Sequence, residues 1–183
     1  MPSVSPNILH VFARRWCLPI LAELEKREGS KFVTLARELG ATPAAVRQSL
    51  DHLIELELVQ PNPGYGHPLR PEYILTTEGN RLGPSVLLLE RAVNRLADKE
   101  VAFLRWSMPA LAVVGGSPLS RFSEIGAALS PVTDRALAQT LKRMQAGQLV
   151  TRGIEDSYPP VPGYSLGRQG KLLIEPLMAL ADA

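Results

Sequence analysis

The residue types that usually carry enzyme chemistry are few in this sequence and do not cluster. The histidines, His10, His52 and His67, stand far apart and show none of the spacings typical of metal ligands. Four carboxylates of the expected helices have no histidine or nucleophile at a recognisable spacing; they are Glu55, Glu57, Glu124 and Asp134. We therefore expect no enzyme activity, no metal site and no cofactor.

The sequence holds a single cysteine, Cys17. One cysteine cannot form an intramolecular disulfide or a thiolate zinc cluster, which fits a reducing cytoplasm. Because it adjoins Trp16 on an expected helix, we interpret it as a small buried hydrophobe. The alternative is a redox sensor, since Arg14 and Arg15 could lower the pKa of the thiol.

Side chains that can read nucleic-acid bases occur in two segments of similar pattern. Glutamine can pair bidentately with adenine, and arginine with guanine. The candidates for base readout are Arg47, Gln48, Arg135 and Gln139. Thr42 and Thr133 precede the two segments, where a helix N-terminus with exposed amides could contact phosphate.

Helical periodicity sorts each segment into an inner and an outer face. The inner apolar stripe is Val46, Leu50 and Leu53 in the first segment and Leu137, Leu141 and Met144 in the second. The outward face then carries Ala44, Arg47, Gln48, Asp51 and His52, and in the second segment Arg135, Ala138, Gln139, Lys142 and Arg143. Arg70 and Arg152 lie in expected hairpins. The predicted DNA-binding residues are Thr42, Arg47, Gln48, His52, Arg70, Thr133, Arg135, Gln139, Lys142, Arg143 and Arg152.

The two segments differ in charge. Residues 42–56 carry one cation against two carboxylates, whereas residues 133–147 carry three cations against one carboxylate. Phosphate affinity grows with the number of neutralising cations, so the second segment is predicted to bind DNA more strongly. The whole chain has a net charge of only +2, which permits a nucleic-acid partner without requiring one.

An internal repeat explains why the two segments are alike. Arg15–Ala22 aligns with Arg105–Ala112 at an offset of 90 residues, and after a one-residue slip Gly79 aligns with Gly170 at an offset of 91. Two copies of one unit therefore fill almost all of the 183 residues. We expect a first domain with a connecting helix over residues 1–96 and a second domain over residues 97–183.

Each copy predicts helix, helix, helix, β-hairpin, helix. In the first copy the helices are expected at Ile8–Arg27, at Phe32–Leu39, from Pro43 after the Thr42 cap, and at about Thr77–Leu96. Pro19 either kinks the first of these helices or opens its second half. The strands are expected at Leu58–Gln60 and Tyr73–Leu75. The counterparts are helices at Phe103–Val114, Phe122–Leu129, from Thr133, and Gln169–Leu180, with strands Leu149–Arg152 and Tyr164–Leu166. This order is typical of a winged helix-turn-helix. The predicted fold class is mainly α with short β-hairpins (α+β), as two tandem winged helix-turn-helix domains forming a pseudo-dimer.

Apolar stretches near Ile20, Val86 and Val113 are too short to span a membrane, so we expect a soluble, cytoplasmic protein. The connecting helix holds more apolar residues than one solvated face would: Val86, Leu87, Leu88, Leu89 and Val93. They are predicted to pack against the N-terminal helix and the second unit.

The second copy resembles the HxlR-type regulators within the wider MarR-like winged-helix group. The resemblance rests on Trp106, Arg121–Ile125, Thr133–Leu141, Gly147–Val150, Pro159, Tyr164–Leu166 and Gly170. The first copy is similar through Trp16, Lys31-Phe32, Leu35, Thr42–Leu50, Leu58-Val59, Tyr73–Thr76 and Gly79. The resemblance implies a transcription factor of a family that usually forms homodimers from one-domain chains and in which some members use a cysteine as sensor. This sequence departs from it by fusing two units, by Gly167 in place of a capping threonine, and by an uncharged wing tip at residues 64–67.

Three classes of function follow. The first is a sequence-specific DNA-binding transcriptional regulator that uses two recognition helices of one chain as an intramolecular pseudo-dimer, with double-stranded DNA as partner, no membrane partner, and room for a small-molecule effector or a homodimer. The alternative is a tandem winged-helix module for protein interaction or chromosome architecture without sequence-specific DNA binding, as in the segregation and condensation protein B family. A small-molecule-binding protein or enzyme is third, with no supporting motif. Salt-sensitive retardation of duplex DNA would separate the first from the others.

Overall fold

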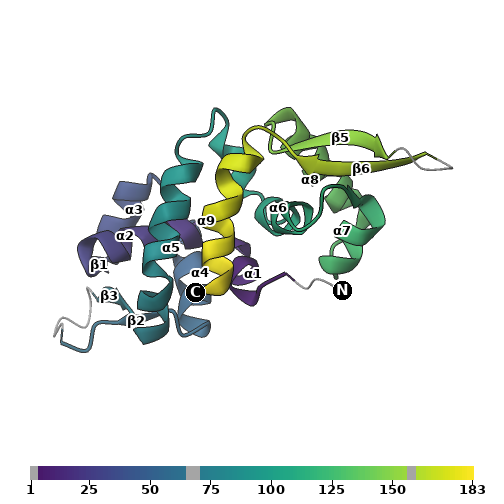
Figure 1. Ribbon diagram of the computed structural model, residues 1–183. Coiled ribbons are helices and arrows are strands. Elements are labelled where there is room, and N and C mark those ends of the chain that lie inside the picture. The colour runs from purple at the N-terminus through teal and green to yellow at the C-terminus, as the bar shows by residue number, and fades with distance from the viewer. Residues whose placement is uncertain (1–3, 65–70, 156–159) are drawn as a thin grey trace.

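The computed structural model contains two winged-helix units that share one hydrophobic core (Figure 1). It describes residues 4–64, 71–155 and 160–183. The first unit consists of α1 (Pro6–Phe12), α2 (Cys17–Arg27), β1 (Ser30–Lys31), α3 (Phe32–Leu39), α4 (Pro43–Glu55), β2 (Val59–Pro61), β3 (Glu72–Leu75) and α5 (Thr77–Val93). The second consists of η1 (Lys99–Phe103), α6 (Ser107–Gly115), β4 (Ser120–Arg121), α7 (Phe122–Ala128), α8 (Asp134–Ala146), β5 (Val150–Glu155), β6 (Val161–Leu166) and α9 (Gly170–Asp182). The expected mainly helical α+β class with two tandem winged helix-turn-helix units is confirmed.

The long N-terminal helix expected at Ile8–Arg27 is two helices. The chain leaves the helix after Phe12 and re-enters it at Cys17, so that Pro19 is the third residue of α2. A proline there removes no helical hydrogen bond, because the first amides of a helix have no partner within it. Pro109 holds the same place in α6, where the continuous helix expected from Phe103 is likewise a 3-10 turn followed by α6.

The helices α4 and α8 are built alike. Each is 13 residues long and begins after a threonine whose Oγ1 accepts a hydrogen bond from an amide three residues on, at 3.3 Å in both. This cap satisfies one of the unpaired amides of the first turn. The predicted inner stripes are buried in both helices. The sequence-derived faces of these two helices are therefore correct on the inner side.

Each unit has a three-stranded antiparallel sheet rather than a two-stranded hairpin. The strand orders are β1-β3-β2 and β4-β6-β5. The extra strands β1 and β4 have two residues each, too few to show an alternating pattern. The second hairpin is also longer than expected, because β6 begins at Val161 and includes Pro162. Proline is tolerated there since β4 pairs only with Tyr164 and Gly163, which leaves Pro162 at an edge.

Two equivalent glycines let the last helix of each unit approach the sheet. A Cβ atom on Gly79 would lie 2.1 Å from the carbonyl oxygen of Leu58, and one on Gly170 would lie 2.0 Å from that of Leu149. No side chain fits at either contact. The repeat of Gly79 in Gly170 therefore reflects the same close packing of α5 and α9 against the wing.

The two units are joined by packing between α5 and α9, which lie side by side (Figure 1). Helix α1 of the first unit also contacts α6 and α9 of the second. Carbonyl oxygens in the last turns of α9 accept side-chain hydrogen bonds from the first unit: Ser85 Oγ to Ala179, Asn7 Nδ2 to Leu180, and Ser5 Oγ to Ala181, at 3.1, 3.3 and 3.0 Å. These bonds satisfy acceptors that a helix C-terminus cannot pair by itself.

The prediction that the apolar residues of the connecting helix are buried is correct in part. Val86, Leu89 and Val93 are fully buried, and Leu87 is half-buried, but Leu88 is 52% exposed. One helix cannot turn four consecutive residues inward, and Leu88 lies opposite the stripe formed by the other positions. The helix also ends at Val93 instead of Leu96, because the chain turns at Asn94 to reach η1.

Candidate nucleic-acid interface

The outer face of α8 presents its polar residues to solvent. Arg135, Gln139, Lys142 and Arg143 are all exposed, as is the capping residue Thr133. Among the residues that the structure describes, none of the three cations on this helix forms an ion pair or hydrogen bond with another side chain. This face therefore has unneutralised positive charge, and the N-terminus of the helix, with its partial positive charge, lies at its start.

Arg152 extends the positive surface onto the wing of the second unit. It lies on β5, is exposed, and pairs across the ladder with Tyr164 of β6. Its expected counterpart in the first unit, Arg70, lies outside the described residues. The strand pairs β2–β3 and β5–β6 lie toward opposite ends of the molecule (Figure 1).

The outer face of α4 is also exposed at Thr42, Arg47 and Gln48, but its cation is engaged. The Arg47 guanidinium lies 4.4 Å from the centre of the Phe32 ring and donates a hydrogen bond of 3.1 Å to the hydroxyl of Tyr73. It is also 3.8 Å from a carboxylate oxygen of Asp51. Arg47 is thus held by its own unit through cation–π, hydrogen-bond and ionic contacts.

His52 does not point outward as the helical wheel predicts. It is half-buried, and its Nε2 lies 3.3 Å from the carbonyl oxygen of His10. The wheel places His52 at the border of the polar face, and α1 covers that border, which a wheel of α4 alone cannot reveal. Burial first, and then the nearby His52 ring, lower the pKa of His10. His52 is therefore a contact between α4 and α1.

Phe32 and Tyr73, which were not among the predicted site residues, hold the guanidinium of Arg47 against the first unit. Their counterparts in the second unit are Phe122 and Tyr164, but the position of Arg47 is taken by Ala138. The signal that could have found them is the repeat itself. Both aromatic residues are present in the two units, whereas the arginine is present only in the first.

Cys17 is not placed to act as a reactive thiol. Cys17 is fully buried, its Sγ lies 3.9 Å from the carbonyl oxygen of Ser49, and burial raises the pKa of the thiol to about 12. A buried thiol that stays protonated fits the small hydrophobe and not the redox sensor. Across residues 4–64, 71–155 and 160–183, no group of histidines, cysteines and carboxylates could hold a metal ion. Within the same ranges, none of the helices combines the length and the apolar character needed to cross a membrane.

A threonine-capped outward helix followed by a three-stranded wing defines the winged helix-turn-helix class of proteins, and here the arrangement occurs twice. The chain belongs to the HxlR-like helix-turn-helix family, which it matches over residues 11–101 and again over residues 104–183. Membership places it among helix-turn-helix proteins of transcriptional regulation and not among enzymes.

Individual relatives are similar over parts of the chain. An uncharacterized HTH-type transcriptional regulator of Methanothermobacter thermautotrophicus is 32% identical over 94 residues, which cover 51% of this chain and 66% of the relative, just under two thirds of its length. Among solved structures, one described as a MarR-family transcriptional regulator from Enterococcus faecalis V583 is 24% identical, with a TM-score of 0.39, over 54% of this chain and 81% of that one. IdeR of T. acidophilum is 18% identical, with a TM-score of 0.29, over 79% and 55% of the two chains.

Proposed function

We propose that the protein is a sequence-specific DNA-binding transcriptional regulator, in which units 1–96 and 97–183 act as an intramolecular pseudo-dimer on double-stranded DNA. The observation that carries the proposal is the outer face of α8, where Arg135, Lys142 and Arg143 are exposed and unpaired within the described residues. Such cations release counterions from phosphate, and Arg and Gln in the first half of the helix can reach base edges.

The pairing of equivalent helices supports the pseudo-dimer. Helices α5 and α9 are the same element of the two units, and they pack together within one chain. Dimeric helix-turn-helix proteins bind half-sites about 34–36 Å apart, one turn of DNA. Because α4 and α8 differ on their outer faces, the preferred site should be an imperfect palindrome, with the half-site read by α8 contributing more affinity.

The test is fluorescence anisotropy with two duplexes, one selected from a random library and one random, at several salt concentrations. The expected result is tighter binding to the selected duplex, with an affinity for both that falls steeply as salt rises. Light scattering on the complex should give one chain per site. Two chains per site would contradict the intramolecular arrangement, and no binding to either duplex would favour a protein-interaction module.

A further inference from the structure

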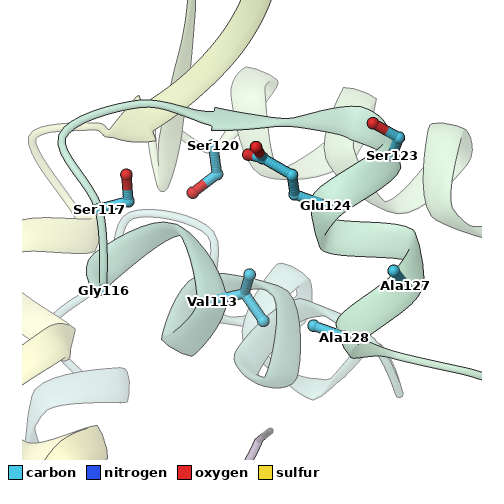
Figure 2. A pocket seen from close by; sticks show the side chains of 8 residues that line it. All are labelled: Val113, Gly116, Ser117, Ser120, Ser123, Glu124, Ala127 and Ala128. Carbon is cyan, nitrogen blue, oxygen red and sulfur yellow. The ribbon is translucent and has the colours of Figure 1, made fainter. Parts of the chain in front are cut away.

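A cavity of about 510 Å³ opens between α6 and α7 of the second unit (Figure 2). This volume lies in the range of pockets that hold small molecules. The polar side chains of Ser117, Ser120 and Glu124 approach one another at one end, and Val113 and Ala128 lie at the other. None of its lining residues belongs to α8, so a ligand in this cavity would leave the candidate DNA-binding face uncovered.

The first unit carries charged side chains at the equivalent positions. The backbone equivalence is close, because Ser30 pairs with Tyr73 as Ser120 pairs with Tyr164. At the offset of 90 residues, the first unit has Glu23, Lys26, Arg27, Arg37 and Glu38 where the second has Val113, Gly116, Ser117, Ala127 and Ala128. Every one of these five positions exchanges a long charged side chain for a smaller one.

In the first unit four of these side chains pair with one another, whereas Lys26 pairs with Glu90 of α5. Arg27 forms an ion pair with Glu23 and lies 3.6 Å from Glu38, which Arg37 contacts at 2.9 Å. Glu38 belongs to α3 and Arg27 to α2, so the network joins the two helices that correspond to α7 and α6. The small residues of the second unit replace this network with open space.

The lining of the cavity determines which ligand it suits. Glu124 is the charged residue among those that line it. One carboxylate oxygen accepts a hydrogen bond of 2.7 Å from the Arg121 amide, which anchors the carboxylate at the start of α7. The hydroxyl group of Ser120, a residue only 3% exposed, lies beside it. A fixed negative charge favours a cationic hydrogen-bond donor and disfavours an anion, while Val113 and Ala128 favour an apolar body.

We propose that this cavity is a binding site for a small apolar amine, with the ammonium group on Glu124 and the apolar part against Val113 and Ala128. The site is present only in the second unit, because only there have the ion-pairing residues between the two helices been replaced. The proposal does not depend on DNA binding, and its test uses the full chain without DNA.

The probes are three molecules of one shape and different charge: benzylamine, benzyl alcohol and benzoate. Each is titrated into the protein while amide chemical shifts are followed by NMR. We expect benzylamine to shift the signals of α6 and α7 and to bind more tightly than benzyl alcohol by on the order of threefold, as a partly exposed ionic contact allows. Benzoate should bind most weakly. Absence of shifts in α6 and α7 with all three probes, or a preference for benzoate, would overturn the proposal.

Two variants and a matched control locate the site. Ser117→Arg with Ala128→Glu transplants the ion pair of the first unit and should abolish benzylamine binding. The reverse exchange in the first unit, Arg27→Ser with Glu38→Ala, should leave it unchanged. Glu124→Gln keeps an acceptor for the Arg121 amide but removes the charge, so benzylamine and benzyl alcohol should then bind equally. Thermal melting verifies that each variant is folded. Unchanged benzylamine binding in the transplanted variant, or an unchanged amine preference in Glu124→Gln, would contradict the assignment.

Discussion

Helices α4 and α8 have the same length, the same threonine cap and the same buried stripe, but their outer faces differ in how cations are engaged. In α4 the guanidinium of Arg47 is held by Phe32, Tyr73 and Asp51. In α8 the cations lie at other positions, and within the described residues none has a side-chain partner. The cations of α8 are therefore available to bind a ligand, whereas Arg47 of α4 is already engaged by side chains of its own unit.

This difference shows that the exposed positions of a duplicated unit can diverge more freely than the buried ones. Inner positions are matched in both copies because any change there must be accommodated by a packed core. Outer positions exchange even opposite charges, as Asp51 and Lys142 do. The same contrast separates the ion pairs between α2 and α3 from the cavity between α6 and α7.

The largest expected effect tests whether the inner faces are equivalent. Leu50 and Leu141 are both fully buried, so Leu50→Ala and Leu141→Ala should each cost about 2–5 kcal/mol of unfolding free energy. Because one hydrophobic cluster spans both units, each variant should unfold in a single transition. The measurement is urea denaturation followed by circular dichroism. Two separate transitions would show that the units fold independently.

The next effect concerns the outer face of α8. Arg135→Ala and Gln139→Ala should each cost about 1–3 kcal/mol on the selected DNA site and much less on random duplex, because base contacts carry sequence preference. Lys142→Ala should weaken binding to both DNAs, as loss of a phosphate contact does. Anisotropy titrations at fixed salt give these values. Equal losses on both DNAs for Arg135→Ala would reassign Arg135 to phosphate contact.

A smaller effect is expected for the engaged cation of α4. Arg47→Ala should lower the unfolding free energy by about 0.5–1 kcal/mol, through loss of its contact with Phe32, and should reduce DNA affinity less than Arg135→Ala does. Arg37→Ala, which removes an exposed arginine paired with Glu38, is the matched control for charge. If Arg47→Ala weakens DNA binding as much as Arg135→Ala, the two helices contribute equally and the comparison fails.

The smallest effect is an absence of reaction at Cys17. Burial raises the pKa of the Cys17 thiol to about 12, so the thiol remains protonated at pH 8, and burial also blocks access to it. Iodoacetamide at pH 8 should leave the native protein unmodified over hours and modify it in urea, as measured by intact mass. The second unit has Ser107 at this position, so Cys17→Ser is the natural control for folding. Rapid modification of the native protein would restore the redox-sensor hypothesis.

Local features of this fold could be predicted from the sequence because they depend on neighbouring residues. Threonine caps, proline at the start of α4, and apolar stripes at helical spacing act within one or two turns. The repeat supports each local prediction a second time, because the apolar pattern of Val46, Leu50 and Leu53 recurs at Leu137, Leu141 and Met144. The class, the order of elements and the inner faces of the recognition helices followed from these signals.

The remaining features were decided by tertiary contacts between segments far apart in the chain. α1 covers the edge of α4 where His52 lies, and Phe32 and Tyr73 meet Arg47 from other elements. The two-residue strands exist only because β3 and β6 lie beside them. Helical spacing shows which residues share a face, but it cannot show which partner covers that face or where a replaced side chain leaves a cavity.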